Sequence, residues 1–455
     1  MVEKQKRDSF TSKIGILAAT LGSAVGLGNI WKFPTVIGQN GGASFLLIYI
    51  IATIVAGLPI MIAEIAIGRS TRANAVEGFK KLSSGYWWLV GFAGTLSTVF
   101  VLGFYTEVAG WIYAYIFKAA NGSINTTQPV VAGYIFQELL SNPWQTLLWQ
   151  WLVIILVATI VLRGASKGIE KAATILMPIL FILLIIICIR SITLPNAIEG
   201  LRFLFMPDFS KIDGRVILLA MGLAFFKLSI GMGVMLTYGS YFKDDVNIPY
   251  MATKVMLLDL VVSLLSGIAI FPAVFSFGFE PSSGPGLLFI TIPAVFDSMP
   301  AGQIFTGAFF ILAAVASTGA MLSLFETPVA WAIDTFNLSR KNTTIIIMLF
   351  FIAFGAPVAL SENILKHITI FGMNFFQLYD FLSSNILMPL GGFFLCIFVG
   401  YVWNKQMVMH AISNGGTLHN QGLIKLLLFQ CRYVTPVIIL IIMLHGFNLF
   451  AYIFN

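Results

Sequence analysis

The sequence predicts an all-α integral membrane protein with eleven transmembrane helices. Apolar residues make up 58% of the 455 residues, charged residues make up 10%, and the mean hydropathy is +0.92. Soluble proteins carry about 25% charged residues, so lipid is the environment that suits this chain. Apolar runs also recur from end to end with short gaps. We therefore interpret residues 1–455 as a single domain embedded in a lipid bilayer.

Eleven apolar runs have the length of about 20 residues that a spanning helix needs. They cover approximately residues 12–38, 43–69, 86–117, 146–163, 170–190, 214–241, 247–277, 306–335, 342–361, 374–403 and 426–452. A further apolar stretch, 287–296, is shorter and suits a re-entrant or interfacial helix better than a span.

Lysines and arginines are distributed unevenly over the loops between these runs. Most of them fall on one side if the N-terminus is cytoplasmic. The positive-inside rule then predicts a multi-pass protein of the plasma membrane, with its N-terminus in the cytoplasm and its C-terminus outside. The net charge of +7 comes from these scattered residues, so no nucleic-acid partner is expected.

The residues that usually carry enzyme chemistry show no catalytic pattern. The three cysteines lie in or beside apolar runs, and neither they nor the four histidines have metal-ligand spacing. A nucleophile elbow in a suitable context and a glycine-rich phosphate loop are also missing from the sequence. We therefore expect no enzyme, no metal site and no cofactor.

Two of the predicted spans are interrupted at corresponding places. Residues 22–29 read GSAVGLGN and residues 226–233 read FKLSIGMG. Glycine costs about 1 kcal/mol in a helix interior, and unwound backbone inside a membrane survives where it lines a cavity. Close helix packing through small residues is the alternative. Two breaks five helices apart predict inverted repeats with a binding site between them near the midplane.

At these residues the chain resembles the neurotransmitter:sodium symporter family. The segment 26–34, GLGNIWKFP, follows the family's first-helix signature, and the likeness continues through 57–69, 163–170 and 334–340 over nearly the whole chain. The resemblance implies two inverted five-helix repeats, about 12–190 and 214–403, with helices 1 and 6 unwound at the midplane. An extra helix at about 426–452 completes an eleven-helix form similar to some bacterial members, whereas the family usually has twelve.

The resemblance also implies a small-molecule substrate, an amino acid, between the two broken helices. Tyr105 matches the tyrosine that binds the substrate carboxylate, and a helix N-terminus near Leu27 and Gly28 favours the same anion. Apolar residues at the matched positions favour an apolar amino acid. The expected substrate-binding residues are Ser23, Ala24, Leu27, Gly28, Val101, Tyr105, Phe226, Ser229, Met232, Ala320 and Leu324.

Two charge pairs match the gates of the family. Lys32 and Asp380 match the outer pair, in which the family usually has arginine, and Arg7 and Asp334 match the inner pair. Lysine lacks the bidentate fork of arginine, so a looser outer gate is expected. Gates at both ends indicate alternating access, since a channel would need a continuous polar pore.

The first sodium site departs from the family pattern. Ala24, Asn29 and Asp259 match its ligand positions, but Lys227 stands where serine or threonine is usual. A lysine at the centre of a membrane helix costs about 3 kcal/mol, so we expect it to pair with Asp259. Its ammonium would then occupy the place of the ion and carry its charge. A lysine that reaches an interface is the alternative, which its mid-span position disfavours.

The second sodium site also lacks ligands. Its two hydroxyl positions match Gly319 and Ala320, which have no side-chain oxygen. Ser317 and Thr318 lie just before them, and a two-residue slip with a bulge would restore the hydroxyls. A hard cation wants oxygen ligands, so the unslipped register predicts a poor site.

These departures predict a transporter that moves its amino acid without sodium, with proton coupling as the replacement. A buried lysine beside an aspartate can change its charge state through burial and pairing. Tyr49 and Ser263 match the chloride site of animal members, but Leu223 and Lys227 replace other ligands, so chloride dependence is not expected. A sodium-coupled symporter with unusual ligands and a non-transporting amino-acid sensor stay open as alternatives. The oligomeric state is undetermined.

Overall fold

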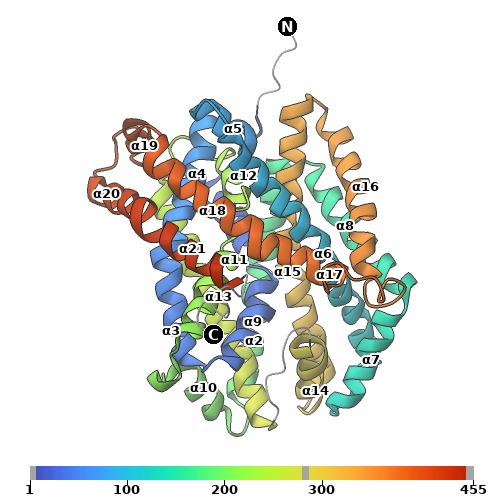
Figure 1. Cartoon of the computed structure of the whole chain (residues 1–455). Helices are drawn as coiled ribbons and strands as arrows, with labels where there is room; N and C mark the ends of the chain where they lie inside the picture. The colour runs from blue at the N-terminus through green and yellow to red at the C-terminus, as the bar shows by residue number, and fades with distance from the viewer. Residues whose placement is uncertain (1–6, 279–285, 447–455) are drawn as a thin grey trace.

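The computed structural model describes residues 7–278 and 286–446 as a bundle of helices (Figure 1). Within those residues, the β structure consists of one isolated antiparallel bridge between Ile370 and Met373. The α-helices are α1 (Lys13–Ala24), α2 (Phe33–Gln39), α3 (Ala43–Ala52), α4 (Leu58–Thr71), α5 (Ala75–Leu82), α6 (Trp88–Ala120), α7 (Pro129–Ser141), α8 (Pro143–Val161), α9 (Lys171–Ile192), α10 (Ala197–Phe205), α11 (Gly214–Lys227), α12 (Val234–Gly239), α13 (Ile248–Ser276), α14 (Ile292–Asp297), α15 (Gly302–Phe336), α16 (Arg340–Ala359), α17 (Phe375–Asp380), α18 (Met388–Ile397), α19 (Lys405–Ile412), α20 (Gln421–Phe429) and α21 (Thr435–Gly446).

Short segments of π-helix or 3-10 helix extend or join several of these helices. They are η1 (Gly28–Lys32), η2 (Thr53–Gly57), η3 (Ala165–Glu170), η4 (Phe209–Lys211), η5 (Leu287–Thr291), η6 (Phe381–Leu387), η7 (Phe398–Val402) and η8 (Gln430–Val434).

Nine continuous helical stretches within the described residues are long and apolar enough to cross a membrane. A tenth candidate is a pair bent by 52°, Lys13–Ala24 with Gly28–Gln39. These ten correspond to ten of the eleven spans predicted from the sequence. The other predicted span, 214–241, is divided into α11 and α12, each too short to cross a bilayer alone.

The structure agrees with the short helix predicted at 287–296 and shifts the start of the last predicted span, 426–452. The apolar helix expected at 287–296 is present as η5 and α14, Leu287–Asp297, and it is too short to span. The last predicted span, 426–452, begins earlier, at Gln421, while its residues 447–452 lie outside the described part of the chain.

Polar residues fix where many of the helices begin. The side chains of Ser12, Asn74, Asn142, Asp213 and Asn247 each accept a hydrogen bond from a backbone N–H in the first turn of the following helix. Such caps satisfy donors that the helix leaves unpaired at its start. The boundaries of these helices therefore follow from local sequence.

The helices differ in how deeply they lie in the bundle. In α15, 89% of the most apolar 18-residue segment is buried inside the protein. In the spans Ala165–Ile192 and Arg340–Ala359, the corresponding share is 33%. In Figure 1, α5 and α19 lie at one end of the bundle, while α7, α10 and α14 lie at the opposite end. We refer to these as the α5 end and the α14 end. The central helices α1, α6, α11 and α15 position the candidate site between the two ends.

Candidate functional site

The breaks in the two interrupted helices lie against each other. Helix α1 ends at Ala24 and the chain becomes helical again at Gly28, while α11 ends at Lys227 and α12 begins at Val234. The hydroxyl of Ser229 donates a hydrogen bond of 3.0 Å to the carbonyl oxygen of Ser23 at the end of α1. The two interrupted spans are therefore in direct contact at their breaks.

Side chains from neighbouring helices bind the backbone groups that the second break leaves free. The N–H of Gly231 donates to Glu64 Oε1 at 2.7 Å, and the hydroxyl of Thr98 donates to the carbonyl oxygen of Met232 at 2.8 Å. Buried backbone groups are costly when unpaired, so these bonds stabilise the break. Glu64 thus closes the break between α11 and α12 from the side of α4.

The predicted substrate-binding residues converge around the break in α1. The N–H of Leu27 donates to the hydroxyl of Tyr105 at 2.8 Å. A Cβ atom added to Gly26 would lie 2.6 Å from that hydroxyl and 2.9 Å from Cβ of Ala320, so residue 26 has no room for a side chain. Val101, Met232 and Leu324 are buried, and Phe226 is half-buried. Ser23 Oγ donates to Ser323 Oγ on α15 at 2.8 Å.

Lys227 is buried in the centre of the bundle and its ammonium has three hydrogen-bond acceptors. Nζ lies 2.9 Å from the hydroxyl of Tyr49 and 3.2 Å from Asp259 Oδ2, and it also donates to the hydroxyl of Ser263. An ammonium has three N–H donors, so all of them are engaged. The prediction that Lys227 pairs with Asp259 is confirmed, and the alternative of a lysine that reaches the membrane surface is excluded.

Asn29 completes this cluster through its side-chain amide. Its Nδ2 donates to Asp259 Oδ1 at 2.7 Å and to Ser263 Oγ at 3.1 Å, while its Oδ1 accepts from the N–H of Gly26 at 3.2 Å. The cluster therefore joins the break in α1 to α13 and α11. We refer to Asn29, Tyr49, Lys227, Asp259 and Ser263 as the lysine cluster.

The helices that would form the second sodium site pack backbone against backbone. A Cβ atom added to Gly319 on α15 would lie 3.0 Å from the carbonyl oxygen of Gly22 on α1 and 3.3 Å from Cε of Met177 on α9. Helix α15 runs unbroken through this region, and the hydroxyls of Ser317 and Thr318 donate to the carbonyl of Ala314 on their own helix. The two-residue slip considered from the sequence therefore does not occur.

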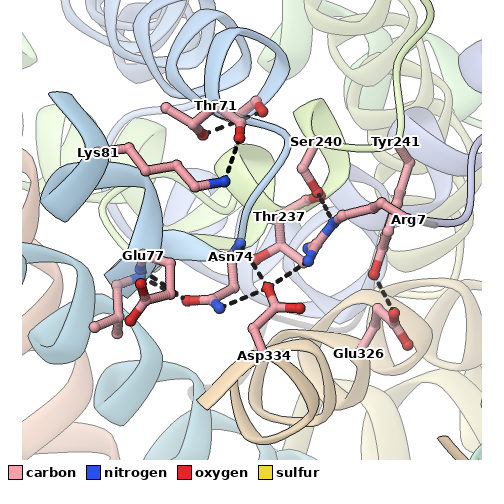
Figure 2. Close-up of polar contacts among 12 residues, drawn as sticks. Arg7, Thr71, Asn74, Glu77, Lys81, Thr237, Ser240, Tyr241, Glu326 and Asp334 are labelled. Carbon is pink, nitrogen blue, oxygen red and sulfur yellow. Dashed lines mark hydrogen bonds and ion pairs between the residues drawn. The ribbon is translucent and has the colours of Figure 1, made fainter. Parts of the chain in front are cut away.

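The pair expected as the inner gate, Arg7 with Asp334, forms an ion pair at the α5 end (Figure 2). Arg7 donates to Asp334 Oδ2, and its Nε donates to Ser240 Oγ at 3.0 Å. The same carboxylate oxygen accepts from Nδ2 of Asn74 at 2.7 Å. The predicted pairing is therefore confirmed, and it is linked to the start of α5.

Further polar contacts beside this pair hold neighbouring helix ends together. The hydroxyl of Tyr241 donates to Glu326, and Arg340 NH2 lies 2.5 Å from Glu326 Oε2. Glu170 on η3 accepts from the N–H groups of Thr11 and Ser12 at 2.7 and 3.0 Å. The contacts of Glu170 fasten the segment that carries Arg7 across the α5 end.

The two residues expected as the outer gate, Lys32 and Asp380, are not paired with each other in this structure. Nζ of Lys32 lies 3.9 Å from the ring centroid of Phe226, a cation–π contact. Asp380 accepts instead from the hydroxyl of Ser384 at 2.8 Å. Lys32 and Phe226 both line a cavity of about 190 Å³ with Asn385 and Ser384. Lys32 thus lines the cavity and Asp380 is hydrogen-bonded to Ser384 in its lining, while the ion pair between Lys32 and Asp380 stays a prediction for another conformation.

Sequence reasoning missed some of the residues that hold these sites together. Asn74 is not among the predicted partners of Asp334, although an asparagine directly before a helical run is a typical cap and so predicts a position at a helix start. Tyr49 and Ser263 match a chloride site in the sequence, whereas the structure makes them partners of Lys227. The sequence shows that both residues carry hydroxyls, but it does not show that both hydroxyls contact Lys227.

Comparisons with known proteins agree with this architecture. The model of the sodium:neurotransmitter symporter family matches residues 7–130 and 140–453. A sodium-dependent transporter of Bacillus subtilis is 38% identical over 99% of this chain and 100% of its own length. The human sodium- and chloride-dependent taurine transporter is 26% identical over 90% of this chain and 73% of its own length.

A solved structure extends the likeness to three dimensions. The crystal structure of MhsT in complex with L-phenylalanine superposes with a TM-score of 0.89, is 41% identical, and is matched over 97% of this chain and 100% of that one. The family model covers nearly the whole chain, and the bacterial relative matches it from end to end. The chain therefore belongs to the sodium:neurotransmitter symporter family, whose members are membrane transporters and not enzymes.

Proposed function

We propose that this protein carries an apolar amino acid across the plasma membrane by alternating access, and that Lys227 takes the place of the first sodium ion. The buried lysine cluster is the observation that carries the proposal. A fixed ammonium, hydrogen-bonded to Asp259, supplies one positive charge where the family is expected to hold a cation. Transport without sodium follows from this substitution.

The substrate class is supported by the surroundings of the α1 break. Val101, Met232 and Leu324 are apolar and buried, and Tyr105 lies beside the N–H of Leu27, where an α-carboxylate would find donors. MhsT, which this chain resembles in fold and sequence, was crystallised with L-phenylalanine, an apolar amino acid. The three N–H groups of Lys227 are engaged, so its charge would act on the carboxylate through space rather than by a direct bond.

The packing at Gly319 supports the absence of a second sodium ion. Gly22 and Gly319 approach so closely that an added Cβ would be crowded, and Met177 covers the same place. A hard cation needs several oxygen ligands arranged around it, and positions 319 and 320 supply no side-chain hydroxyl. A proton that moves on and off the lysine cluster is the coupling that we propose in place of sodium, because buried ionisable groups are the usual proton carriers in membranes.

The membrane arrangement that we propose has eleven crossings. The two halves α11 and α12 form the sixth, and the crossings divide into two inverted repeats, about 12–190 and 214–403, followed by one further helix. The α5 end, where the N-terminal segment is fastened, faces the cytoplasm, and the C-terminus faces the outside.

Uptake into proteoliposomes tests the proposal. Radiolabelled leucine and phenylalanine would be offered with an inward sodium gradient, an inward proton gradient, both, or neither. We expect uptake without sodium that increases with the proton gradient. Uptake that requires sodium would refute the role of Lys227 as the substitute, and saturable binding without uptake would indicate a sensor.

Sodium-coupled symport is the second candidate function. Two bacterial relatives favour it, because both are named sodium-dependent transporters. One is the Bacillus subtilis protein, and the other is a Haemophilus influenzae protein that is 32% identical over 98% of this chain. In this case the lysine cluster would be structural, and a sodium ion would bind elsewhere. The sodium arm of the uptake experiment separates the two candidates.

A further inference from the structure

A large cavity at the α5 end, lined in part by basic side chains, lies outside the substrate site. It has a volume of about 790 Å³ and lies between the end of α4, the loop before α13, and α19. Its lining includes Arg69, Arg72, Trp403, Gln406 and His410. Binding pockets for small ligands fall in this size range, so the cavity has room for a ligand headgroup.

Arg69, a buried guanidinium with no ion pair in the described part of the chain, is one of the residues that line this cavity. Arg69 is 6% exposed and donates to the carbonyl oxygen of Val246 at 2.5 Å, to Asn414 Oδ1 at 2.8 Å and to the carbonyl oxygen of Ala411. Among the described residues, no carboxylate forms an ion pair with it within 4.0 Å. Carbonyl dipoles solvate its charge without cancelling it, so an anion in the cavity would be stabilised.

A second buried donor also lines the cavity. Trp403 is 3% exposed, and its indole N–H is buried without a hydrogen-bond partner among the described residues. A buried, unpaired donor is unfavourable, so an acceptor that reaches this N–H from the adjoining cavity would be stabilised. Arg72 adds a half-buried cation, whose NH1 donates to the carbonyl oxygen of Phe242. Its NH2 pairs with Asp244 Oδ1 at 2.6 Å, and this aspartate is 91% exposed, so water weakens the pair.

The surroundings of the cavity are apolar and exposed. Met407 on its rim is 47% exposed, and Tyr401, Leu426 and Phe429 on the neighbouring segments are between 53% and 57% exposed. Such residues face acyl chains in a membrane protein, and tyrosine is typical of the headgroup level. A basic cavity next to an apolar face at the expected cytoplasmic side matches the requirements of an anionic lipid.

We propose that the cavity between α4 and α19 binds the phosphate group of an anionic phospholipid, with the acyl chains on the apolar face of α20. Arg69 supplies the buried positive charge, Arg72 turns from Asp244 to the phosphate, and the indole N–H of Trp403 donates to a phosphate oxygen. The lipid would link α4 to α19, two segments far apart in sequence.

Native mass spectrometry of the purified full-length protein tests this site. Dioleoylphosphatidylglycerol, dioleoylphosphatidylcholine and inorganic phosphate would each be titrated. We expect phosphatidylglycerol to bind at least tenfold more tightly than phosphatidylcholine. Trp403→Phe, which keeps the ring and removes the donor, and Arg72→Gln would each weaken this binding at least tenfold, as expected for a lost hydrogen bond to a charged group.

Arg163→Gln is the matched control, because Arg163 is exposed and lies outside the cavity. Its binding of phosphatidylglycerol should equal that of the wild type. Equal binding of the two lipids, equal losses in the control and the cavity variants, or unchanged binding in both cavity variants would overturn the proposal. Inorganic phosphate that competes as well as the lipid would also overturn it, in favour of a site for free phosphate. A monodisperse elution profile identifies variants that have folded.

Discussion

Nζ of Lys227 lies 3.2 Å from Oδ2 of Asp259, and neither side chain is exposed to solvent. One residue comes from the end of α11 and the other from the middle of α13. A buried ion pair gains little net stability by itself, but removal of one partner leaves an uncompensated charge. Single and double substitutions in this pair can therefore distinguish its effect on stability from its effect on transport.

Removal of the lysine should abolish transport and destabilise the protein. Lys227→Met leaves Asp259 buried without its cation, which typically costs about 3–5 kcal/mol. We expect a lower midpoint of thermal unfolding in detergent and at least a tenfold loss of leucine uptake. The double variant Lys227→Met with Asp259→Asn should recover most of the stability but none of the uptake. Normal uptake in either variant would show that the charge is dispensable.

A hydroxyl at position 319 should not create sodium dependence. Gly319→Thr places Cβ 3.0 Å from the carbonyl oxygen of Gly22, and overpacking of this kind costs about 1–3 kcal/mol. We expect a lower thermal midpoint, reduced uptake and an unchanged response to sodium. Gly307→Ala in the same helix is the control, since its Cβ would have its nearest contact at 4.0 Å and alanine favours the helix. A sodium requirement in Gly319→Thr would contradict the packing argument.

Loss of the Tyr105 hydroxyl should weaken substrate binding. Tyr105→Phe removes the group that lies 2.8 Å from the N–H of Leu27, at the expected carboxylate position. One hydrogen bond to a charged group is worth about 1.5–3 kcal/mol, so the KM for uptake should rise at least tenfold. Tyr113→Phe, which removes the hydroxyl that bonds Thr318 at 2.8 Å, serves as the control and should leave KM unchanged. An equal rise in both variants would remove Tyr105 from the substrate site.

Weakening of the inner gate should open the α5 end. Asp334→Asn removes the charge that Arg7 binds, and Asn74 then keeps only a neutral partner (Figure 2). In a Thr237→Cys background, we expect alkylation of the buried cysteine by a membrane-impermeant reagent from this end to become several-fold faster. Lys80→Gln breaks the exposed pair with Glu77 and is the control. Equal alkylation rates in Asp334→Asn and Lys80→Gln would mean that Arg7 and Asp334 do not hold this end closed.

Several features of the fold could be predicted because they depend on local sequence. Apolar length places a helix in a membrane whatever its neighbours are, so ten of the eleven predicted spans correspond to helices or to the bent pair. Glycine clusters weaken a helix locally, so the interruptions after Ala24 and after Lys227 could also be located. The helices between the spans, such as α7, α10 and α19, were not predicted, because they are short and pack against the bundle.

Some features of the candidate site could likewise be predicted from the sequence, whereas others depend on the tertiary structure. The sequence by itself determined which unusual residues the protein has: a lysine in a span, an aspartate that could pair with it, and a glycine where a hydroxyl was expected. The tertiary structure alone decided that the hydroxyls of Tyr49 and Ser263 accept hydrogen bonds from the same ammonium as Asp259. It also decided that Gly319 packs against Gly22. The ammonium of Lys32 contacts the ring of Phe226 and not the carboxylate of Asp380. Residue type and span follow from side-chain chemistry and helix length. Which groups meet depends on how helices distant in sequence pack together, and no local pattern encodes those distances.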